Sequence, residues 1–280
     1  MFERVAALRG GAARAAPGRS NSMRLCIFAS YPRGRYARAT VNTVRALAQA
    51  GYSVALVNSN RAVPVTAELR GLCHSVHLRE NGGFDWGAWA DVLPELAYVW
   101  RRAECRSVLF TNDSYLAPVF GQASFEAKLR ALWARDLDLC GMTISHEVER
   151  HIQSYWIEVS ARVVRESREL HRLLVPSELR AMRTVREVIL QREVAFLRRM
   201  LAERPAYRVG ALHEAPAGDA SNPYIHHYDD RLVPERFPLF KLSVLRLRSE
   251  AGHAAWREVV ANRRAVYEWR ELDDRNRGTV

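Results

Sequence analysis

Short apolar runs alternate with amphipathic helical patterns along most of the chain. The run over 24–30 predicts a buried strand, and apolar residues on one helical face predict a helix over 37–50 that ends at Gly51. A second strand is expected over 52–57, so this first unit has the length of a parallel strand–helix–strand crossover. The pattern therefore predicts an α/β protein.

The same alternation continues towards residue 200 and favours one domain with a doubly wound, mostly parallel sheet and flanking helices. An Arg- and Glu-rich helical region over 161–201 should be divided in two by Pro176. Residues 215–228 have the Pro, Gly, Asp and Asn content of a loop. We expect the remaining helices over 67–72, 84–100 (kinked at Pro94) and 125–134, and the remaining strands over 75–78, 107–110, 137–144 and 152–159.

The two ends of the chain differ from its middle. Residues 1–22 are rich in Ala, Gly and Arg, so we expect a disordered basic tail or an upstream start codon chosen over Met23. Residues 23–250 should form the domain, and 251–280 a charged C-terminal helical segment. The sequence holds no run of roughly 20 mostly apolar residues, the length that a membrane-spanning helix needs.

Composition narrows the class of protein. With 48% hydrophobic and 26% charged residues, the chain is neither largely disordered nor fibrous. The net charge is +11, but arginines alternate with glutamates, as on solvated helix faces, so we expect no nucleic-acid partner. No CxxC spacing occurs, which favours unpaired thiols in a reducing cytosol at Cys26, Cys73, Cys105 and Cys140.

Several familiar motifs are absent or fail on spacing. The chain has no Walker loop, no GxGxxG and no GxSxG. His146 and His151 are one position too far apart for the i, i+4 zinc pair of a metalloprotease helix. The His and Asp pairs within 226–230 fit a solvated loop better than a metal site.

Two polar segments follow predicted strands. Asn81 and Asp85 belong to a Gly-rich stretch that opens a helix, and Asn112 and Asp113 end an apolar strand abruptly. Ligands of open α/β sheets bind at the carboxyl ends of the strands. A carboxylate such as Asp113 can hold a hard divalent ion together with substrate phosphates.

Several longer motifs follow one another along the chain. They are Asn-x-Gly-x-Asp-x-Gly-Ala at 81–88, Thr-Asn-Asp-Ser at 111–114 with Pro118, Asp-x-Asp-x-x-Gly-x-Thr at 136–143, His-Ile-Gln-Ser-Tyr at 151–155, Glu-Val-Ile at 187–189, Glu-Val at 193–194 and Phe-Pro-Leu-Phe-Lys at 237–241. In this order they resemble the rhamnan-synthesis protein F family of bacterial glycosyltransferases, which build rhamnose-containing surface polysaccharides and lipopolysaccharide O-chains. The sequence departs from the family at Leu239-Phe240 and at Arg192. Asp136 and Asp138 precede a strand rather than follow one, so we interpret this DxD as a decoy.

The resemblance implies a GT-A-like glycosyltransferase that uses a nucleotide-sugar donor such as dTDP- or GDP-rhamnose. It further implies a glycan or lipid-linked glycan acceptor and a cytoplasmic location. Because the net charge is strongly positive, we also expect weak peripheral contact with the anionic inner face of the cell membrane. A divalent cation, Mg²⁺ or Mn²⁺, would be held by Asp113. The implied donor-binding residues are Asn81, Gly83, Asp85, Asn112, Asp113, His151, Gln153 and Lys241.

An acceptor hydroxyl needs a general base, and carboxylates are the usual choice. The candidates are Glu147, Glu187 and Glu193. Glu193 is favoured because apolar residues follow it directly, whereas Glu147 lies in a charged, exposed-looking stretch. Glu187 is the second catalytic candidate, although helical geometry points it about 120° away from Glu193.

Two alternatives remain open from sequence alone. A non-catalytic relative could keep the fold and bind a nucleotide sugar or a phosphate without turnover. A basic nucleic-acid-binding protein is the other, because the net charge is strongly positive.

Overall fold

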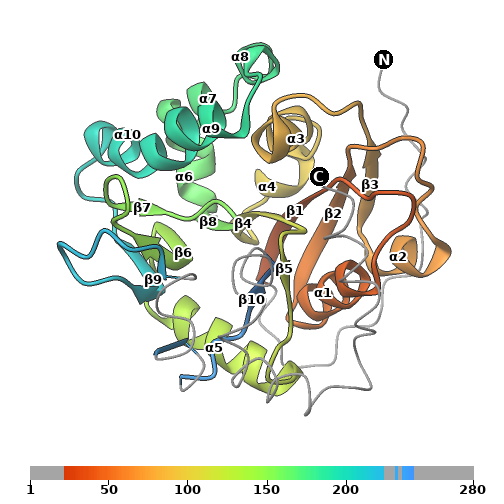
Figure 1. Cartoon of the computed structure of the whole chain (residues 1–280), viewed down its shortest axis with the longest axis horizontal. Coiled ribbons are helices and arrows are strands. Elements are labelled where there is room, and N and C mark those ends of the chain that lie inside the picture. The colour runs from red at the N-terminus through yellow and green to blue at the C-terminus, as the bar shows by residue number, and fades with distance from the viewer. Residues whose placement is uncertain (1–21, 224–230, 233–234, 243–280) are drawn as a thin grey trace.

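The computed structural model describes residues 22–223, 231–232 and 235–242 (Figure 1). The expected N-terminal tail, apart from Ser22, and the expected helical segment over 251–280 lie outside these ranges, as do the histidines of 226–227. Within the same ranges, no helix is long and apolar enough to cross a membrane.

The first half of the chain builds a parallel sheet. Its four strands lie in the order β3-β2-β1-β4, and every neighbouring pair among them is parallel. The predicted strand–helix–strand unit is confirmed as β1-α1-β2, and the predicted bounds of α2 and β3 are the observed ones. The elements are β1 (Met23–Ser30), α1 (Arg38–Gln49), β2 (Tyr52–Asn58), α2 (Ala67–Leu72), β3 (Ser75–Leu78), α3 (Phe84–Val92), α4 (Ala97–Trp100) and β4 (Cys105–Asn112).

The second half adds antiparallel strands, which the sequence does not predict. Strand β8 is antiparallel to both β4 and β6, β7 is antiparallel to β6, and β9 runs parallel to β6. Only residues 146–150 join β6 to β7, too few for the helical crossover that a parallel pair requires. The sheet is therefore mixed and mostly parallel. The added elements are β5 (Tyr115–Leu116), α5 (Gln122–Ala134), β6 (Leu139–Ser145), β7 (His151–Ile152), β8 (Trp156–Ser160), β9 (Val209–Glu214) and β10 (Phe240–Lys241).

Both faces of the sheet are covered by helices, as a doubly wound fold requires. Side chains of β1 alternate between two buried clusters: Leu25 and Ile27 belong to one, and Cys26 and Phe28 to the other. The first cluster includes residues of α3, α4, α6, α7 and α10, and the second includes residues of α1, α2 and α5. The predicted single α/β domain is confirmed.

The long helical region over 161–201 is broken more often than Pro176 alone predicts. The side chains of Ser160, Ser167 and Thr184 each accept a hydrogen bond from a backbone N–H and start a new helix. Similarly, the predicted 84–100 helix ends before Pro94 instead of kinking there. The pieces are α6 (Ala161–Glu166), α7 (Arg168–Leu173), α8 (Pro176–Ala181), α9 (Val185–Val188), the π-helix η1 (Ile189–Val194) and α10 (Ala195–Glu203).

Gly83 occupies the N-cap of α3 with a left-handed φ of 72°. A Cβ at this position would lie 2.8 Å from the Leu179 carbonyl oxygen, so α8 packs directly on the glycine. We expect Gly83→Ala to lower the free energy of unfolding by about 2–4 kcal/mol, from backbone strain plus overpacking.

Gly51→Ala is the matched control for urea unfolding of the Gly83 variant. Gly51 also has a positive φ, of 99°, but no atom lies within 4 Å of the place that a Cβ would take, so this variant should show the strain alone, about 1 kcal/mol. Equal losses in the two variants would show that the contact with α8 adds nothing.

Candidate functional site

A cluster of polar side chains lies where the strand order reverses. Strand β1 pairs with β2 on one side and with β4 on the other, and ligands of open α/β sheets bind at the carboxyl ends of such a pair. Ser30 ends β1 and Asn112 ends β4. The Ser30 hydroxyl donates a 2.7 Å hydrogen bond to Asp113 Oδ2, so these two strand ends are joined by side chains.

Asn112 connects the two sequence motifs. Its Nδ2 donates a 2.6 Å hydrogen bond to Asp85 Oδ2, and its Oδ1 accepts one of 3.0 Å from the Ser114 backbone N–H. Asp85 lies in the first turn of α3, which begins directly after the left-handed Gly83. The predicted grouping of Asp85, Asn112 and Asp113 is therefore what the fold produces.

Burial and the nearby Asp113 carboxylate raise the pKa of Asp85 from 3.8 to about 7, although the hydrogen bond from Asn112 opposes the shift. The folded protein therefore holds this proton more tightly than the unfolded chain does. The free energy of unfolding should fall as the pH rises from about 4 to about 7, because ionised Asp85 is disfavoured only in the folded state.

Asp85→Asn removes that ionisation, so we expect it to stabilise the protein at pH 8 and to change little at pH 4. Three pKa units would correspond to about 4 kcal/mol, and solvent near the half-buried carboxyl reduces the expected gain to about 1–2 kcal/mol. Urea unfolding at both pH values measures it.

Asp138→Asn serves as a control, because its expected effect on stability at pH 8 has the opposite sign to that of Asp85→Asn. Burial raises the pKa of Asp138, but the Arg208 backbone N–H and the Arg162 guanidinium outweigh it, and the net pKa is lowered. This variant should lose stability at pH 8. A gain there, or no pH dependence for Asp85→Asn, would contradict the assigned electrostatics.

A second group of side chains comes from the β7–β8 turn and η1. The Ser154 hydroxyl donates a 2.6 Å hydrogen bond to Glu193 Oε2, and His151 Nε2 lies 3.9 Å from Glu193 Oε1. The other nitrogen of His151, Nδ1, lies 2.7 Å from the Glu149 carbonyl oxygen, which fixes the orientation of the ring. The Glu193 side chain is 12% exposed and the His151 side chain 5%.

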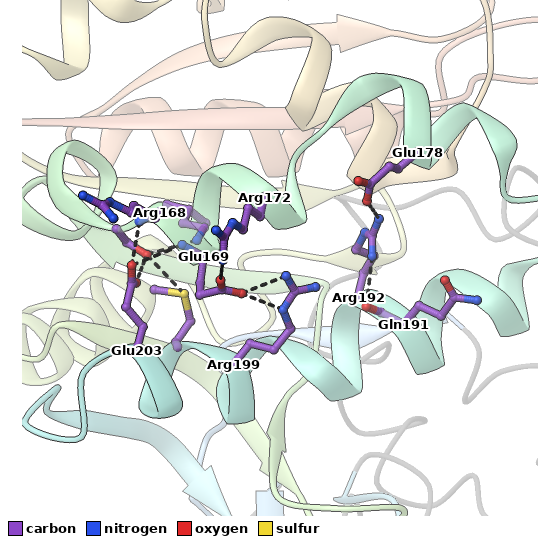
Figure 2. Close-up of polar contacts among 11 residues, drawn as sticks. Arg168, Glu169, Arg172, Glu178, Gln191, Arg192, Arg199 and Glu203 are labelled. Carbon is purple, nitrogen blue, oxygen red and sulfur yellow. Dashed lines mark hydrogen bonds and ion pairs between the residues drawn. The ribbon is translucent and has the colours of Figure 1, made fainter.

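The π-helix η1 is anchored from its outer side (Figure 2). Arg192 is buried and donates a 2.8 Å hydrogen bond from Nη2 to Glu178 of α8. Beside it, Glu169 of α7 accepts hydrogen bonds from Arg172 and Arg199 (Figure 2). The Arg192–Glu178 contact thus ties η1 to α8, and the Arg199–Glu169 contact ties α10 to α7, while the next residue after Arg192, Glu193, contacts the β7–β8 turn. Single π turns inside helices are frequent at functional sites.

Lys241 joins the two groups. Strand β10 pairs antiparallel with β5, opposite Tyr115, and this pairing returns the end of the described chain to the region after β4. The Lys241 ammonium lies 5.1 Å from the centre of the Tyr155 ring. Burial lowers the pKa of Lys241, opposed by the carboxylates of Glu193, Glu147 and Asp85.

The charges of this cluster do not balance. Within the described residues, the carboxylates of Asp85, Glu147 and Glu193 act electrostatically on Lys241, and that of Asp113 acts on Asp85. Arg79 also acts on Asp85, but it is paired with Asp91 at 2.8 Å. An added diphosphate would therefore need a cation. The buried hydroxyl of Tyr36 has no hydrogen-bond partner among the described residues. Burial, and to a smaller extent the Asp113 carboxylate, raises the pKa of Tyr36.

The donor set fits a divalent ion only in part. In the described part of the chain, no group of three or more His, Cys, Asp or Glu side chains is arranged to hold a metal. Mg²⁺ commonly takes one or two carboxylates and completes its shell with water and substrate phosphates. Asp113 and Asp85 fit that arrangement, with the phosphates of a donor as the missing ligands.

Other predicted site residues have structural roles. Gly83 packs on α8, and Gln153, 2% exposed, accepts a 2.6 Å hydrogen bond from Thr143. Glu187 forms a capping box with Thr184 at the exposed start of α9, and backbone hydrogen bonds lower its pKa. Asn81 is exposed in the turn before α3. The structure thus leaves Glu193 as the better-placed of the two catalytic candidates.

The two carboxylates of the DxD lie at the other end of the sheet, where Asp138 is buried and Asp136 is exposed. Asp138 accepts hydrogen bonds from Arg162, at 2.7 Å, and from the Arg208 backbone N–H, at 3.0 Å. Asp136 is exposed and paired with Arg208. Both carboxylates therefore have arginine partners away from the β1–β4 carboxyl ends.

Sequence reasoning missed Ser30, Tyr36 and Ser154. Ser30 could have been predicted as a site residue, because it ends a predicted strand that lies parallel to β4, and β4 ends at the Asn112-Asp113 pair. Tyr36 and Ser154 reach the cluster through loops whose paths are not evident from the sequence pattern.

The fold and the cluster define an α/β protein with a carboxylate-rich site at its topological switch point. The model of the rhamnan synthesis protein F family matches residues 54–267. The chain belongs to this family.

Two relatives and one solved structure are similar over part of their length. Virulence protein VirA of Vibrio anguillarum (strain ATCC 68554 / 775) is 29% identical over 136 residues, 48% of this chain and 42% of VirA. A second virulence protein VirA of Vibrio anguillarum matches with the same identity and the same coverage. The chain thus matches less than half the length of these relatives. The crystal structure of the glycosyltransferase GlyE of Streptococcus pneumoniae TIGR4 aligns with 91% of this chain and 63% of GlyE, at 11% identity and a TM-score of 0.43.

Proposed function

We propose that the protein is a glycosyltransferase that moves a sugar from a nucleotide-sugar donor to a growing cell-surface polysaccharide or lipopolysaccharide O-chain. Membership of the rhamnan synthesis protein F family supports this reaction class, and it favours rhamnose or a related deoxyhexose as the sugar. The observation that carries the proposal is the hydrogen-bonded group Ser30, Asp113, Asn112 and Asp85 at the switch point.

The donor end of the site must neutralise a departing nucleoside diphosphate. Asp113, with Asp85 beside it, would hold Mg²⁺ or Mn²⁺, which supplies positive charge to the phosphate oxygens as the bond to the sugar breaks. The Asp85 carboxylate acts electrostatically on Lys241, so the Lys241 ammonium can meet a phosphate as well. Asn112, which donates a hydrogen bond to Asp85, would position that carboxylate, and Asn81 would bind the nucleoside or the donor sugar.

The acceptor end needs a group that removes the proton from the attacking hydroxyl. We assign this role to Glu193 Oε1, since Ser154 occupies Oε2 and His151 faces Oε1 at 3.9 Å. His151 is the positioning neighbour of that carboxylate. Gln153 supports the same wall through Thr143 and Asn222.

The proposed acceptor is a glycan or a lipid-linked glycan. A lipid-linked acceptor would place the protein in the cytoplasm at the inner face of the cell membrane, in weak peripheral contact with anionic lipid.

A thermal-shift screen of nucleoside diphosphates and nucleotide sugars, with and without Mg²⁺ or Mn²⁺, tests the proposal. A ligand at 100 times its Kd should stabilise the folded protein by about 2.7 kcal/mol, and only in the presence of the ion. A matched screen of Asp136→Asn should give the same shifts, because Asp136 lies with the Arg208 pair. Absence of stabilisation by any compound in the screen would refute donor binding.

Donor hydrolysis separates the enzyme from a non-catalytic relative. A catalyst should release nucleoside diphosphate slowly from its donor even without acceptor, whereas a relative that only binds should show the thermal shift and no release.

A further inference from the structure

A cavity of about 600 Å³ opens beside the amino ends of β1 and β4, whereas the carboxylate cluster lies at their carboxyl ends. It is bordered by the start of β4 at Cys105, by the end of β8 at Ser160 and by the start of α6. The cluster uses the other ends of β1 and β4, and β1 has 8 residues. At about 3.3 Å per residue, the two edges lie roughly 23 Å apart, so this cavity is a separate place on the protein.

The lining of this cavity carries uncompensated positive charge. Three of its arginines are neutralised: Arg24 lies 3.0 Å from Glu158, Arg162 lies 2.7 Å from Asp138, and Arg208 is paired with Asp136. The other two lining arginines, Arg106 and Arg165, form no ion pair among the residues that the structure describes. Both are exposed, and Arg165 donates a 3.4 Å hydrogen bond to a neutral partner, the Trp100 carbonyl oxygen.

The acidic residue at the base of the cavity is fully engaged. Glu158 is 2% exposed, and its carboxylate accepts hydrogen bonds from Tyr52 at 2.9 Å, Trp133 at 3.2 Å and Arg24 at 3.0 Å, and one from Ser107. The Arg24 guanidinium also lies 4.1 Å from the centre of the Trp133 ring. A buried carboxylate with this many donors is a fixed part of the fold, and it leaves Arg106 and Arg165 as the lining arginines that form no ion pair among the described residues.

A second cavity of about 620 Å³ adjoins the first, since Arg165 lines both. One wall is apolar, formed by Leu93, Pro94, Ala97 and Trp100, and the other lining residues are Arg101, Arg165 and His171. At its rim, the Arg101 guanidinium lies 5.0 Å from the centre of the Trp100 ring. A cationic cavity and an apolar cavity therefore meet at one arginine.

We propose that the two cavities together bind a phosphate group carried on an apolar chain. The phosphate would lie against Arg106 and Arg165, and the chain against Pro94, Ala97 and Trp100. Guanidinium groups match phosphate oxygens in geometry and charge, and the apolar wall excludes water from the adjoining chain. This site is independent of the proposed sugar transfer, because it uses other residues at the other edge of the sheet.

Binding of dihexanoyl phosphatidic acid, kept below its micelle-forming concentration, tests the proposal by calorimetry. The wild-type protein should bind it, and Arg106→Ala/Arg165→Ala should bind it at least about tenfold more weakly, equivalent to about 1.4 kcal/mol. Arg183→Ala/Arg186→Ala removes the same net charge from exposed positions before and on α9, and it should leave binding unchanged. Equal weakening in the two double variants would show a general charge effect and overturn the site.

Inorganic phosphate and Pro94→Glu separate the two cavities. Inorganic phosphate should bind the wild type at least about tenfold more weakly than the lipid does, since it gains nothing from the apolar wall. Pro94→Glu should weaken lipid binding and leave phosphate binding unchanged. Equal affinity for phosphate and lipid would show a site for free phosphate alone and overturn the proposed apolar part. Each result is read from binding, so it stands whether or not the protein transfers sugar.

Discussion

Glu193→Gln should lower kcat for sugar transfer by about 10²–10⁴-fold and leave the Kd of the donor unchanged. A positioned general base contributes this factor, and an amide cannot take the proton of the acceptor hydroxyl. The amide oxygen can still accept the hydrogen bond from Ser154, so the local structure should persist. The measurement is steady-state transfer with each substrate varied, together with donor calorimetry.

Two other glutamates provide controls for the Glu193 substitution. Glu187→Gln changes the capping box of α9 and should cost about 1 kcal/mol of stability at most, with kcat unchanged. Glu147→Gln should also change kcat little, because Glu147 is exposed and accepts a 3.0 Å hydrogen bond from Asn222. Normal turnover in Glu193→Gln would move the base elsewhere in the cluster.

Asp113→Asn should weaken metal-dependent donor binding by more than about 100-fold. Loss of a residue that only hydrogen-bonds a metal ligand lowers metal affinity by about 10–100-fold, so loss of a carboxylate ligand itself should lower it more. The amide oxygen of the substituted side chain can still accept the hydrogen bond from Ser30, and the fold should be retained. Calorimetry of a nucleoside diphosphate with Mn²⁺ measures the effect.

Asp136→Asn is the matched control for Asp113→Asn, because both remove one carboxylate without a change of shape. Asp136 belongs to the DxD and is paired with Arg208 in the exposed region before β6. Its variant should bind donor as the wild type does. Loss of donor binding in Asp136→Asn, with none in Asp113→Asn, would assign the metal to the DxD instead.

The sequence predicts the first half of the fold closely because each signal there is local. Short apolar runs define β1, β2 and β3, and Gly51 marks the end of α1. The later strands depend on contacts that the pattern does not contain. Strand β9 pairs with β6 across the α6–α10 region, and β10 is a short pairing with β5.

The candidate site was predictable to the extent that its residues follow strands. Asp85, Asn112 and Asp113 were all expected at carboxyl ends, and the structure joins them. Gly83 shows the limit of motif reading, since its lack of a side chain is required by Leu179 of α8. Arg192 and Glu193 are neighbours on a helix and so point about 100° apart, but only the packed structure shows that one meets Glu178 of α8 and the other Ser154.

Release of nucleoside diphosphate from a panel of UDP-, GDP- and dTDP-sugars in the presence of Mn²⁺ tests the central claim most directly. Polysaccharide or lipid-linked glycan extract serves as the acceptor, and wild type is compared with Asp113→Asn. The account predicts release by the wild type from at least one donor, with a rate that falls by more than about 100-fold in Asp113→Asn. Equal release by the two proteins, or none by the wild type from any donor, would contradict it.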